Sequence, residues 1–259
     1  MGYPGGGTVS RQRAKATFER IRSSGGKPTG SFIFSSDPST TAIFGAAGYD
    51  WLVIDREHGI MDDGVALAHI RAAEAADVIP IVRVLEGRPA LIQKSMDMGA
   101  QGIMIPKIGS ADEAARAVAA SRYQPGGRGM CPIVPGADFT HLNWAEYSRS
   151  INENVLVIPL IETKAGLDNI DEIVKVPGID YVFFGLADLS QDLGIDMIDG
   201  ADELIGHWER VVECAHRQGV AAGAPLGYGF DDLADFGTLG GDFDLLAAAA
   251  RSALSQRAK

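Results

Sequence analysis

Six side chains of types that perform acid–base and metal chemistry follow apolar segments of this sequence. They are Asp55, Glu57, His58, Arg83, Glu162 and Asp188. Each lies at or just past the end of a run that is typical of a buried β-strand. In enzymes built on a (β/α)₈ barrel, the carboxyl ends of the strands carry the chemistry. We therefore expect these side chains to meet at one rim, as a divalent-metal site with a general base.

Glu162 and Asp188 are the candidate metal ligands. They follow the apolar segments VLVIPLI and YVFFGLA. Carboxylate oxygens suit a hard divalent ion such as Mg²⁺ or Mn²⁺. Each acid could instead cap the helix that follows it. At equivalent positions of a barrel, a shared metal ion is the better explanation of the pair.

His58 and Arg83 are the candidates for proton transfer and for anion binding. His58 follows Asp55 by three residues in the segment IDREHGIMDD, and general base is the role that fits it. Arg83 interrupts the apolar strand PIVRV, where a guanidinium is costly unless it reaches a partner. A substrate carboxylate or enolate could be that partner. A buried salt bridge to Asp55 or Glu57 is the alternative, and it could coexist with catalysis.

Asp97 and Arg128 are harder to place. Asp97 lies in the last turn of a helix that ends at Gly99, where the helix dipole disfavours an anion. That end of a barrel helix faces away from the catalytic rim, so Asp97 is either an ordinary exposed acid or serves a neighbouring subunit. The segment YQPGGRG is typical of a flexible loop that could bring Arg128 over a substrate. The stretch 123–154 is long enough to be a lid or a binding segment.

Short apolar segments alternate with helical patterns along the whole chain, as in parallel α/β folds. Eight strands are predicted, over 31–35, 51–55, 80–84, 102–106, 155–161, 181–185, 221–225 and 236–239. Helices are predicted between them and at the C-terminus, over 38–47, 61–76, 88–99, 110–121, 164–176, 201–218 and 242–255. The pattern favours a (β/α)₈ TIM barrel. A doubly wound open sheet is the alternative, because counting strands does not prove closure.

Composition limits the possible functions. The chain has 259 residues, a net charge of −11 and 46% hydrophobic residues, which fit one barrel domain over 11–259 behind a disordered glycine-rich tail over 1–10. The negative charge argues against nucleic acid, and no apolar run approaches the roughly 20 residues of a membrane helix. Cys131 and Cys214 are distant and form no CxxC pair, so we expect reduced thiols and a cytoplasmic protein.

Several ordered segments carry a family resemblance. They are GYDWLVIDREHG, VRV, MDMGAQGIMIPKI, RYQPGGRG, IETKAGLDNIDEI and GIDYVFFGLADLSQDLG. With these segments the chain resembles the HpcH/HpaI aldolase family, the metal-dependent class II pyruvate aldolases that include 4-hydroxy-2-oxoheptanedioate aldolase and macrophomate synthase. The resemblance implies a pyruvate-type barrel whose terminal helix is exchanged between subunits, in a homohexamer built as a trimer of dimers.

The resemblance also implies roles for single residues. Glu162 and Asp188 would hold Mg²⁺ or Mn²⁺, with Co²⁺ also acceptable, and His58 would be the base. Arg83 would stabilise the enolate oxygen. In the family, Asp97 corresponds to an acid that supports the histidine's basicity. The remaining assignments are Asp55 as support for His58 or for metal-bound water, and Gly185, Leu186, Ala187 and Asp188 as the place that receives the pyruvate carboxylate.

The reaction that the resemblance implies is the reversible cleavage of a 4-hydroxy-2-oxo acid to pyruvate and an aldehyde through a metal-stabilised enolate. A dedicated oxaloacetate decarboxylase is one alternative. An acyl-CoA lyase of the citrate-lyase β type is another, but it would need a basic groove that this acidic chain does not obviously offer. A non-enzymatic alternative is a ligand-binding scaffold barrel. Arg56, Leu160 and Leu186 depart from the family's usual residues, so the sequence leaves the substrate open.

Overall fold

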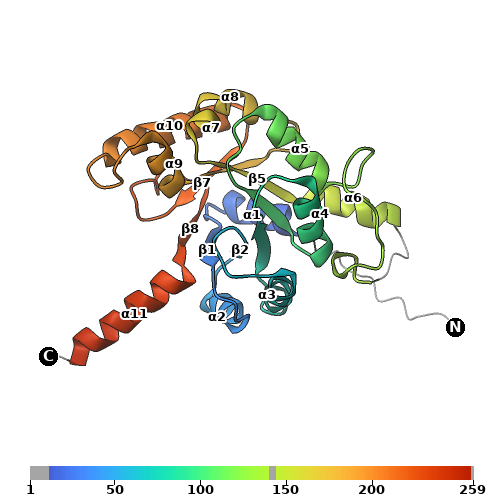
Figure 1. Cartoon of the computed structure of the whole chain (residues 1–259), viewed down its shortest axis with the longest axis horizontal. Helices are drawn as coiled ribbons and strands as arrows, with labels where there is room; N and C mark the ends of the chain where they lie inside the picture. Colours follow the sequence, from blue (N-terminus) through green and yellow to red (C-terminus); the bar gives the residue numbers. More distant parts are fainter. Residues whose placement is uncertain (1–11, 140–143, 258–259) are drawn as a thin grey trace.

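Eight parallel strands form a closed barrel in which each strand pairs with the next and β8 pairs with β1. The computed structural model describes residues 12–139 and 144–257, so the predicted tail over 1–10 lies outside the described residues. The strands are β1 (Thr29–Ile33), β2 (Trp51–Asp55), β3 (Ile79–Arg83), β4 (Gly102–Ile105), β5 (Leu156–Ile161), β6 (Tyr181–Phe184), β7 (Ala221–Pro225) and β8 (Phe236–Gly241). The order confirms the predicted barrel and excludes the open sheet (Figure 1).

The barrel interior is closed at its amino end by α1 (Ala14–Ser23). Phe18 on this helix packs against Trp51, Tyr181 and Phe236, with ring centroids 5.5–5.7 Å apart. These three aromatic residues are the first residues of β2, β6 and β8. Gly30 makes room for the Trp51 ring, because a Cβ there would lie 2.4 Å from it. With this end filled, the opening at the carboxyl ends of the strands is the available site.

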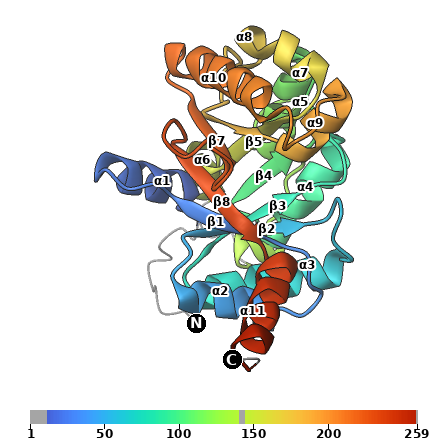
Figure 2. The same ribbon diagram turned by 90° about the vertical axis from the view of Figure 1, so that its left-hand side faces the viewer.

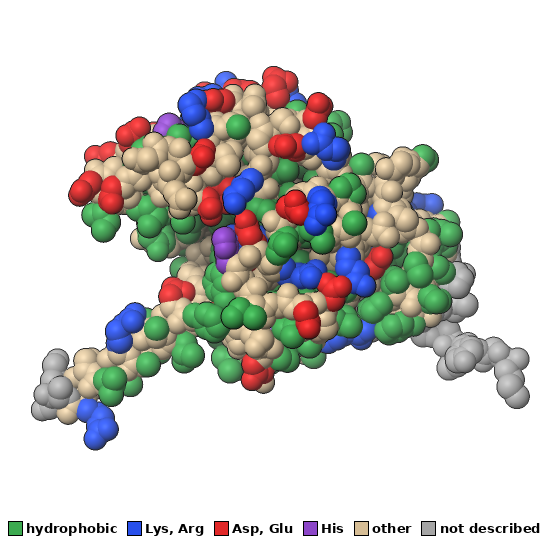
Figure 3. Space-filling model, in the orientation of Figure 1, with side chains coloured by type: hydrophobic (Ala, Val, Ile, Leu, Met, Phe, Trp, Pro, Cys, Tyr) green, Lys and Arg blue, Asp and Glu red, His purple; other side chains and the backbone are tan. Residues whose placement is uncertain are grey.

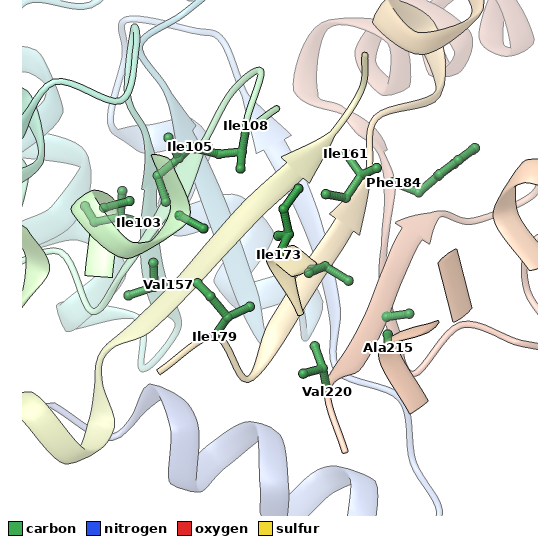
Figure 4. Packing of buried hydrophobic residues seen from close by; sticks show 14 of the residues in the cluster. Ile103, Ile105, Ile108, Val157, Ile161, Ile173, Ile179, Phe184, Ala215 and Val220 are labelled. Atoms are coloured by element: carbon green, nitrogen blue, oxygen red, sulfur yellow. The ribbon is translucent and has the colours of Figure 1, made fainter. Parts of the chain in front are cut away.

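An outer layer of helices covers the strands. It comprises α2 (Ser39–Ala47), α3 (Asp63–Ala75), α4 (Pro89–Met98), α5 (Ala111–Ser121), α6 (Trp144–Asn154), α7 (Lys164–Asp168), α8 (Ile170–Ile173), α9 (Leu186–Leu193) and α10 (Ala201–Arg217). Branched aliphatic side chains fill the space between this layer and the barrel. Figure 4 shows this packing with Ile103, Val157, Ile173 and Val220. Because both faces of the strands are buried, they read as continuous apolar runs.

The predicted helices differ from the observed ones in two ways. The helix predicted over 164–176 is divided at Asn169, which ends α7 and precedes α8. Neither α6 nor α9 was predicted as a helix. The predicted helix over 110–121 is present as α5, and Ser110 caps it, since Ser110 Oγ accepts the Glu113 N–H at 3.3 Å. The Glu113 carboxylate in turn accepts the Gly109 N–H at 2.8 Å, and not the N–H of Ser110.

The last helix, α11 (Asp242–Arg257), leaves the barrel and extends away from it (Figures 1 and 2). Its start is fixed because the Asp242 carboxylate accepts the N–H groups of Phe34 and Ser35 at 3.0 and 2.9 Å. Beyond this anchor, Leu246 and Leu254 are largely exposed on the helix, and hydrophobic side chains are visible on its surface in the space-filling view (Figure 3). Within the ranges described, no helix combines the length and apolarity that crossing a bilayer requires.

Candidate active site

Asp55 and Arg83 form a buried salt bridge at the carboxyl ends of two paired strands. They are opposite one another in the register of β2 and β3. Asp55 accepts Arg83 Nε at 3.0 Å and also accepts Nη2. Its Oδ1 additionally accepts the backbone N–H groups of Glu57 and His58, at 2.9 and 3.2 Å. Asp55 therefore positions both the guanidinium and the loop that carries His58.

The guanidinium of Arg83 keeps one nitrogen for other partners. Its Cζ lies 4.9 Å above the Phe32 ring, and Nη1 is 3.4 Å from Glu57 Oε2. Because Asp55 occupies Nε and Nη2, Nη1 is the atom that faces the other acids. The expected salt bridge is thus present, and it leaves a hydrogen-bond donor for an anionic ligand.

Glu57, expected at this rim and as a possible partner of Arg83, is an acid whose side chain is largely buried. Burial raises the pKa of its carboxyl, and the charge of Asp188 acts in the same direction, while Arg83, His58 and Lys107 oppose the rise. Its Oε2 atom is buried without a hydrogen-bond partner. Its place between Asp55 and His58 in the segment DREH, directly after a buried strand, predicted its position at the rim but not its desolvation.

Glu162 follows β5 and is almost fully buried. Its Oε1 accepts the Lys107 N–H at 2.8 Å. Burial raises the pKa of Glu162 to about 7, helped by the negative charges of Glu57 and Asp188 and opposed by the Lys107 N–H and by Arg83. A carboxylate that is desolvated among other acids is a site that a cation would stabilise.

Neither Glu162 nor Asp188 caps a helix. Thr163 caps α7, since its Oγ1 accepts the Gly166 N–H at 3.1 Å. Asp188 lies inside the first turn of α9, whose cap position is Gly185. A Cβ at Gly185 would lie 2.6 Å from Glu162 Oε2, so this glycine keeps the space beside the carboxylate open. The capping explanation therefore fails for both acids.

This donor set fits a divalent cation. Glu162 and Asp188 provide carboxylate oxygens, which Mg²⁺ and Mn²⁺ prefer. Over 12–139 and 144–257, no group of three or more His, Cys, Asp or Glu side chains is arranged to hold a metal ion. A site with two protein carboxylates is typical of ions that keep further positions for water and substrate oxygens.

His58 lies on the loop after β2, with its side chain 52% exposed. Its Nε2 is 3.8 Å from Glu57 Oε2. Asp55 supports it through the backbone N–H and not through the imidazole. The ring is therefore accessible at the opening that also contains Arg83 and Glu57, which we call the barrel mouth.

The start of α9 offers backbone donors near these acids. The first N–H groups of a helix have no partner within it. Here they belong to Leu186, Ala187 and Asp188, whereas Leu189 N already bonds to Gly185 O. Ala187 is exposed and Leu186 is buried. N–H groups of this kind can bind a carboxylate, which is the role that the family resemblance implies for this turn.

Asp97 and Arg128 lie at the other end of the barrel, because α4 starts near the mouth and runs back to the amino ends of the strands. Arg128 Nη2 donates to Asp97 at 2.7 Å and to the Tyr123 hydroxyl at 2.6 Å. The Arg128 side chain is only 1% exposed. Within one chain, Arg128 is therefore not on a loop that reaches over the barrel mouth, contrary to expectation. Tyr147, in the stretch expected to form a lid, bonds to Gly136, which lies against the end of α4.

A closed parallel barrel with buried carboxylates, an arginine and an accessible histidine at the carboxyl ends of its strands is the arrangement of a (β/α)₈ enzyme. Residues 29–249 match the model of the HpcH/HpaI aldolase/citrate lyase family. The chain belongs to this family, as the resemblance of its motifs predicted.

Named relatives are similar over most of the chain. A hydroxypyruvate/pyruvate aldolase of Roseovarius nubinhibens is 34% identical over 93% of this chain and 96% of its own length. A 2-keto-3-deoxy-L-rhamnonate aldolase of Escherichia coli is 35% identical over 81% of this chain and 77% of its own. The crystal structure of an HpcH/HpaI aldolase/citrate lyase family protein from Burkholderia cenocepacia has a TM-score of 0.86 and 30% identity, covering 95% of this chain and all of the other. The predicted class, an aldolase that acts as a carbon–carbon lyase, is confirmed.

Proposed function

We propose that this protein reversibly cleaves a 4-hydroxy-2-oxo acid to pyruvate and an aldehyde, with a divalent metal ion at the barrel mouth. The observation that carries the proposal is the buried Glu162, whose pKa is raised to about 7 beside Glu57 and Asp188. Desolvated acids that lie close together are unfavourable by themselves, and a bound cation would neutralise their charge. The named aldolase relatives support the reaction type.

Glu162 and Asp188 would hold the metal ion, with Mg²⁺, Mn²⁺ and Co²⁺ as the candidates. When bound, the ion supplies Lewis-acid stabilisation of negative charge on the 2-oxo acid. Glu57 would complete the acidic surroundings, because its buried Oε2 atom has no hydrogen-bond partner of its own.

His58 would act as the general base. As the bond between C3 and C4 breaks, its electron pair moves toward the 2-oxo group, and the proton of the 4-hydroxyl group passes to the imidazole. The C4 fragment leaves as the aldehyde. Return of a proton to C3 completes pyruvate. The exposed position of the His58 ring on the rim supports this role.

Arg83 would stabilise the oxygen on which charge develops. Its Nη1 is the nitrogen that Asp55 leaves free, and its guanidinium is fixed by Asp55 and the Phe32 ring. A preorganised donor of this kind lowers the barrier because it needs no reorganisation during the reaction. The substrate carboxylate would bind the first turn of α9, at Ala187 and Asp188.

We also propose that the chain forms a homo-oligomer, a hexamer built as a trimer of dimers, and that α11 is exchanged between subunits. Phe243, Leu246 and Leu254 are 56–69% exposed on a helix that extends away from its own barrel. Such an arrangement buries apolar surface only when a partner covers it. We place the protein in the cytoplasm, since Cys131 and Cys214 are both free.

Proton NMR of pyruvate in D₂O, with the protein and Mg²⁺, tests the proposal. We expect the methyl signal to decay in the presence of the metal ion and to persist when EDTA is added. Persistence of the signal with bound metal would contradict the proposal. Condensation of pyruvate with a panel of aldehydes, followed in the same tube, separates an aldolase from a decarboxylase that accepts only oxaloacetate.

A further inference from the structure

A small cavity adjoins the barrel mouth, between the loops that follow β3 and β4. Its volume is about 160 Å³, which is room for a group of a few heavy atoms. Three cations line it, Arg88, Lys107 and Arg116, together with two acids, Glu86 and Glu113. The lining therefore has one more cation than acids, in a chain whose net charge is −11.

The two acids of the cavity are already engaged. Glu86 pairs with Arg88 Nε at 2.6 Å. Glu113 accepts the Gly109 N–H at 2.8 Å as part of the cap of α5. Arg116 forms no hydrogen bond or ion pair through its guanidinium with any residue in the described ranges. The cavity therefore carries positive charge that its own acids do not neutralise.

Lys107 connects this cavity to the barrel mouth. Its Nζ forms an ion pair with Glu57 Oε1 at 3.7 Å, beyond hydrogen-bond distance, and its side chain is 58% exposed. Its backbone has a φ of +55°, a conformation that lysine rarely adopts. In this conformation the Lys107 N–H donates to Glu162, a candidate metal ligand. The backbone is thus held at the site, while the ammonium group remains available at the border of the cavity.

We propose that Lys107 and the adjoining cavity bind an anionic group, a carboxylate or a phosphate, at the far end of the aldehyde half of the substrate. The inference rests on the proposed function, because it assigns the aldehyde its chemical class. Lys107 provides the charge nearest to the reacting groups, and Arg116 on α5 provides a second donor. Arg116 has no partner in the described ranges, and Lys107 is held only by its 3.7 Å ion pair with Glu57. Both cations can therefore bind an anionic group, because charge-assisted hydrogen bonds replace the water they lose.

Two pairs of aldehydes test the proposal, each differing chiefly by an anionic group. They are succinic semialdehyde with butanal, and glyceraldehyde 3-phosphate with glyceraldehyde. In condensation with pyruvate, we expect kcat/KM for at least one anionic aldehyde to exceed that of its neutral counterpart by about tenfold or more. The pair that shows the larger ratio distinguishes carboxylate from phosphate.

Variants of the two lysines provide a matched comparison. Lys94 on α4 is 56% exposed and lies 3.8 Å from Asp63, yet it does not line the cavity. We expect Lys107→Met to lower the anionic preference about fivefold or more, mainly through KM, and Lys107→Arg to restore part of it. Lys94→Met should change the ratio less than about twofold, since its charge is screened at the surface. Arg116→Met should act in the same direction as Lys107→Met.

An unmodified enzyme without anionic preference, or equal ratios in Lys107→Met and Lys94→Met, would overturn the proposal. If no aldehyde condenses with pyruvate, the proposed function fails, and the subsite is then judged by binding. Saturation-transfer NMR of succinate and ³¹P line broadening of inorganic phosphate should be weaker with Lys107→Met than with Lys94→Met. Absence of binding to the unmodified protein in both measurements would also overturn the subsite.

Discussion

Two buried pairs of aspartate and arginine lie at opposite ends of this barrel. Asp55 and Arg83 meet at the mouth, and Asp97 and Arg128 meet near the amino ends of the strands. Both guanidinium groups are buried, and both stack on an aromatic ring, at 4.9 Å over Phe32 and 4.0 Å over Tyr123. As isolated contacts, the two pairs are much alike.

Their surroundings differ. The second donor bond of Arg128 goes to the neutral hydroxyl of Tyr123. Around Arg83 lie Glu57 and Glu162, whose pKa values are both raised by burial. The comparison shows that a buried ion pair does not by itself mark a catalytic site. Additional desolvated charges, which a ligand would neutralise, distinguish the mouth from the amino end.

Among variants at the two ends of the barrel, we expect Glu162→Gln at the mouth to have the largest effect on activity. The amide keeps an oxygen for the Lys107 N–H but removes the charge that would bind the metal ion. We expect tight metal binding to be lost and kcat/KM to fall by about 10³-fold or more, because Lewis-acid stabilisation contributes several kcal/mol. Calorimetric titration with Mn²⁺ and an aldol assay measure the two effects. Retained tight binding would remove Glu162 from the ligand set.

The same variant has a pH-dependent effect on stability in the absence of metal. The pKa of Glu162 is raised from 4.5 to about 7 in the folded chain, so its proton stabilises folding below pH 4.5. That contribution is lost as the pH rises through about 7. Glu162→Gln should therefore be more stable than the unmodified protein at pH 8, by up to about 3 kcal/mol, and should lose this advantage near pH 4. Urea unfolding with EDTA at both pH values measures the difference.

His58→Ala should cause the next largest loss. Removal of a general base lowers turnover by roughly 10² to 10⁴-fold, whereas metal binding should persist. His216 on α10 is a matched control, since it is 47% exposed and also lies beside an acid, Asp235, at 2.8 Å. His216→Ala should leave aldol turnover within a few-fold of the unmodified value. Equal losses in both variants would remove His58 from the mechanism.

Lysine substitutions at the two arginines compare the two ends of the barrel directly. Arg83→Lys keeps the positive charge, but a single ammonium group cannot both bind Asp55 and provide the donor that Nη1 offers to a ligand. We therefore expect kcat/KM to fall by about 10²-fold. Arg128→Lys should instead lower the free energy of unfolding by about 1–3 kcal/mol, because donors to Asp97 or Tyr123 are lost. Steady-state kinetics and urea unfolding of both variants give the comparison. A reversal of these effects would contradict our distinction between the two pairs.

The sequence was sufficient for the barrel and for most of the mouth. The strands β2, β3 and β5 read as continuous apolar runs because they are buried on both faces. Asp55 and Arg83 are the last residues of their strands, and Glu162 directly follows β5. The C-terminal boundary of α4 was predictable from Gly99, because helices commonly end at a glycine in the left-handed conformation. In the structure Gly99 has a φ of +109°.

Contacts between distant segments could not be predicted in this way. Arg128 was expected near a substrate because its glycine-rich surroundings indicated a flexible loop. Its actual partner, Asp97, is 31 positions away, and their contact depends on how the loop folds against the end of α4. The φ of +55° at Lys107 likewise follows from its bond to Glu162, 55 positions later. Local propensity does not contain such information.

The smallest expected effect concerns Asp97, for which the family resemblance implies support of the catalytic histidine. Within one chain Asp97 is bound to Arg128, at the end of the barrel opposite His58. If it serves a neighbouring subunit, Asp97→Asn should lower kcat by about tenfold, a fraction of the effect of removing the base itself. If it only pairs with Arg128, the variant should lose stability with little change in kcat.

Mixed oligomers of Asp97→Asn and His58→Ala chains decide between these two roles. If one chain supplies the histidine and another the aspartate, random mixing rebuilds intact sites in roughly a quarter of the positions of a symmetric oligomer. Activity should then rise well above the mean of the two separate variants. Unfolding and refolding of the mixed chains, followed by the aldol assay, measures this gain. Activity equal to the mean would mean that each site is built within one chain, and that Asp97 and Arg128 only stabilise the amino end of the barrel.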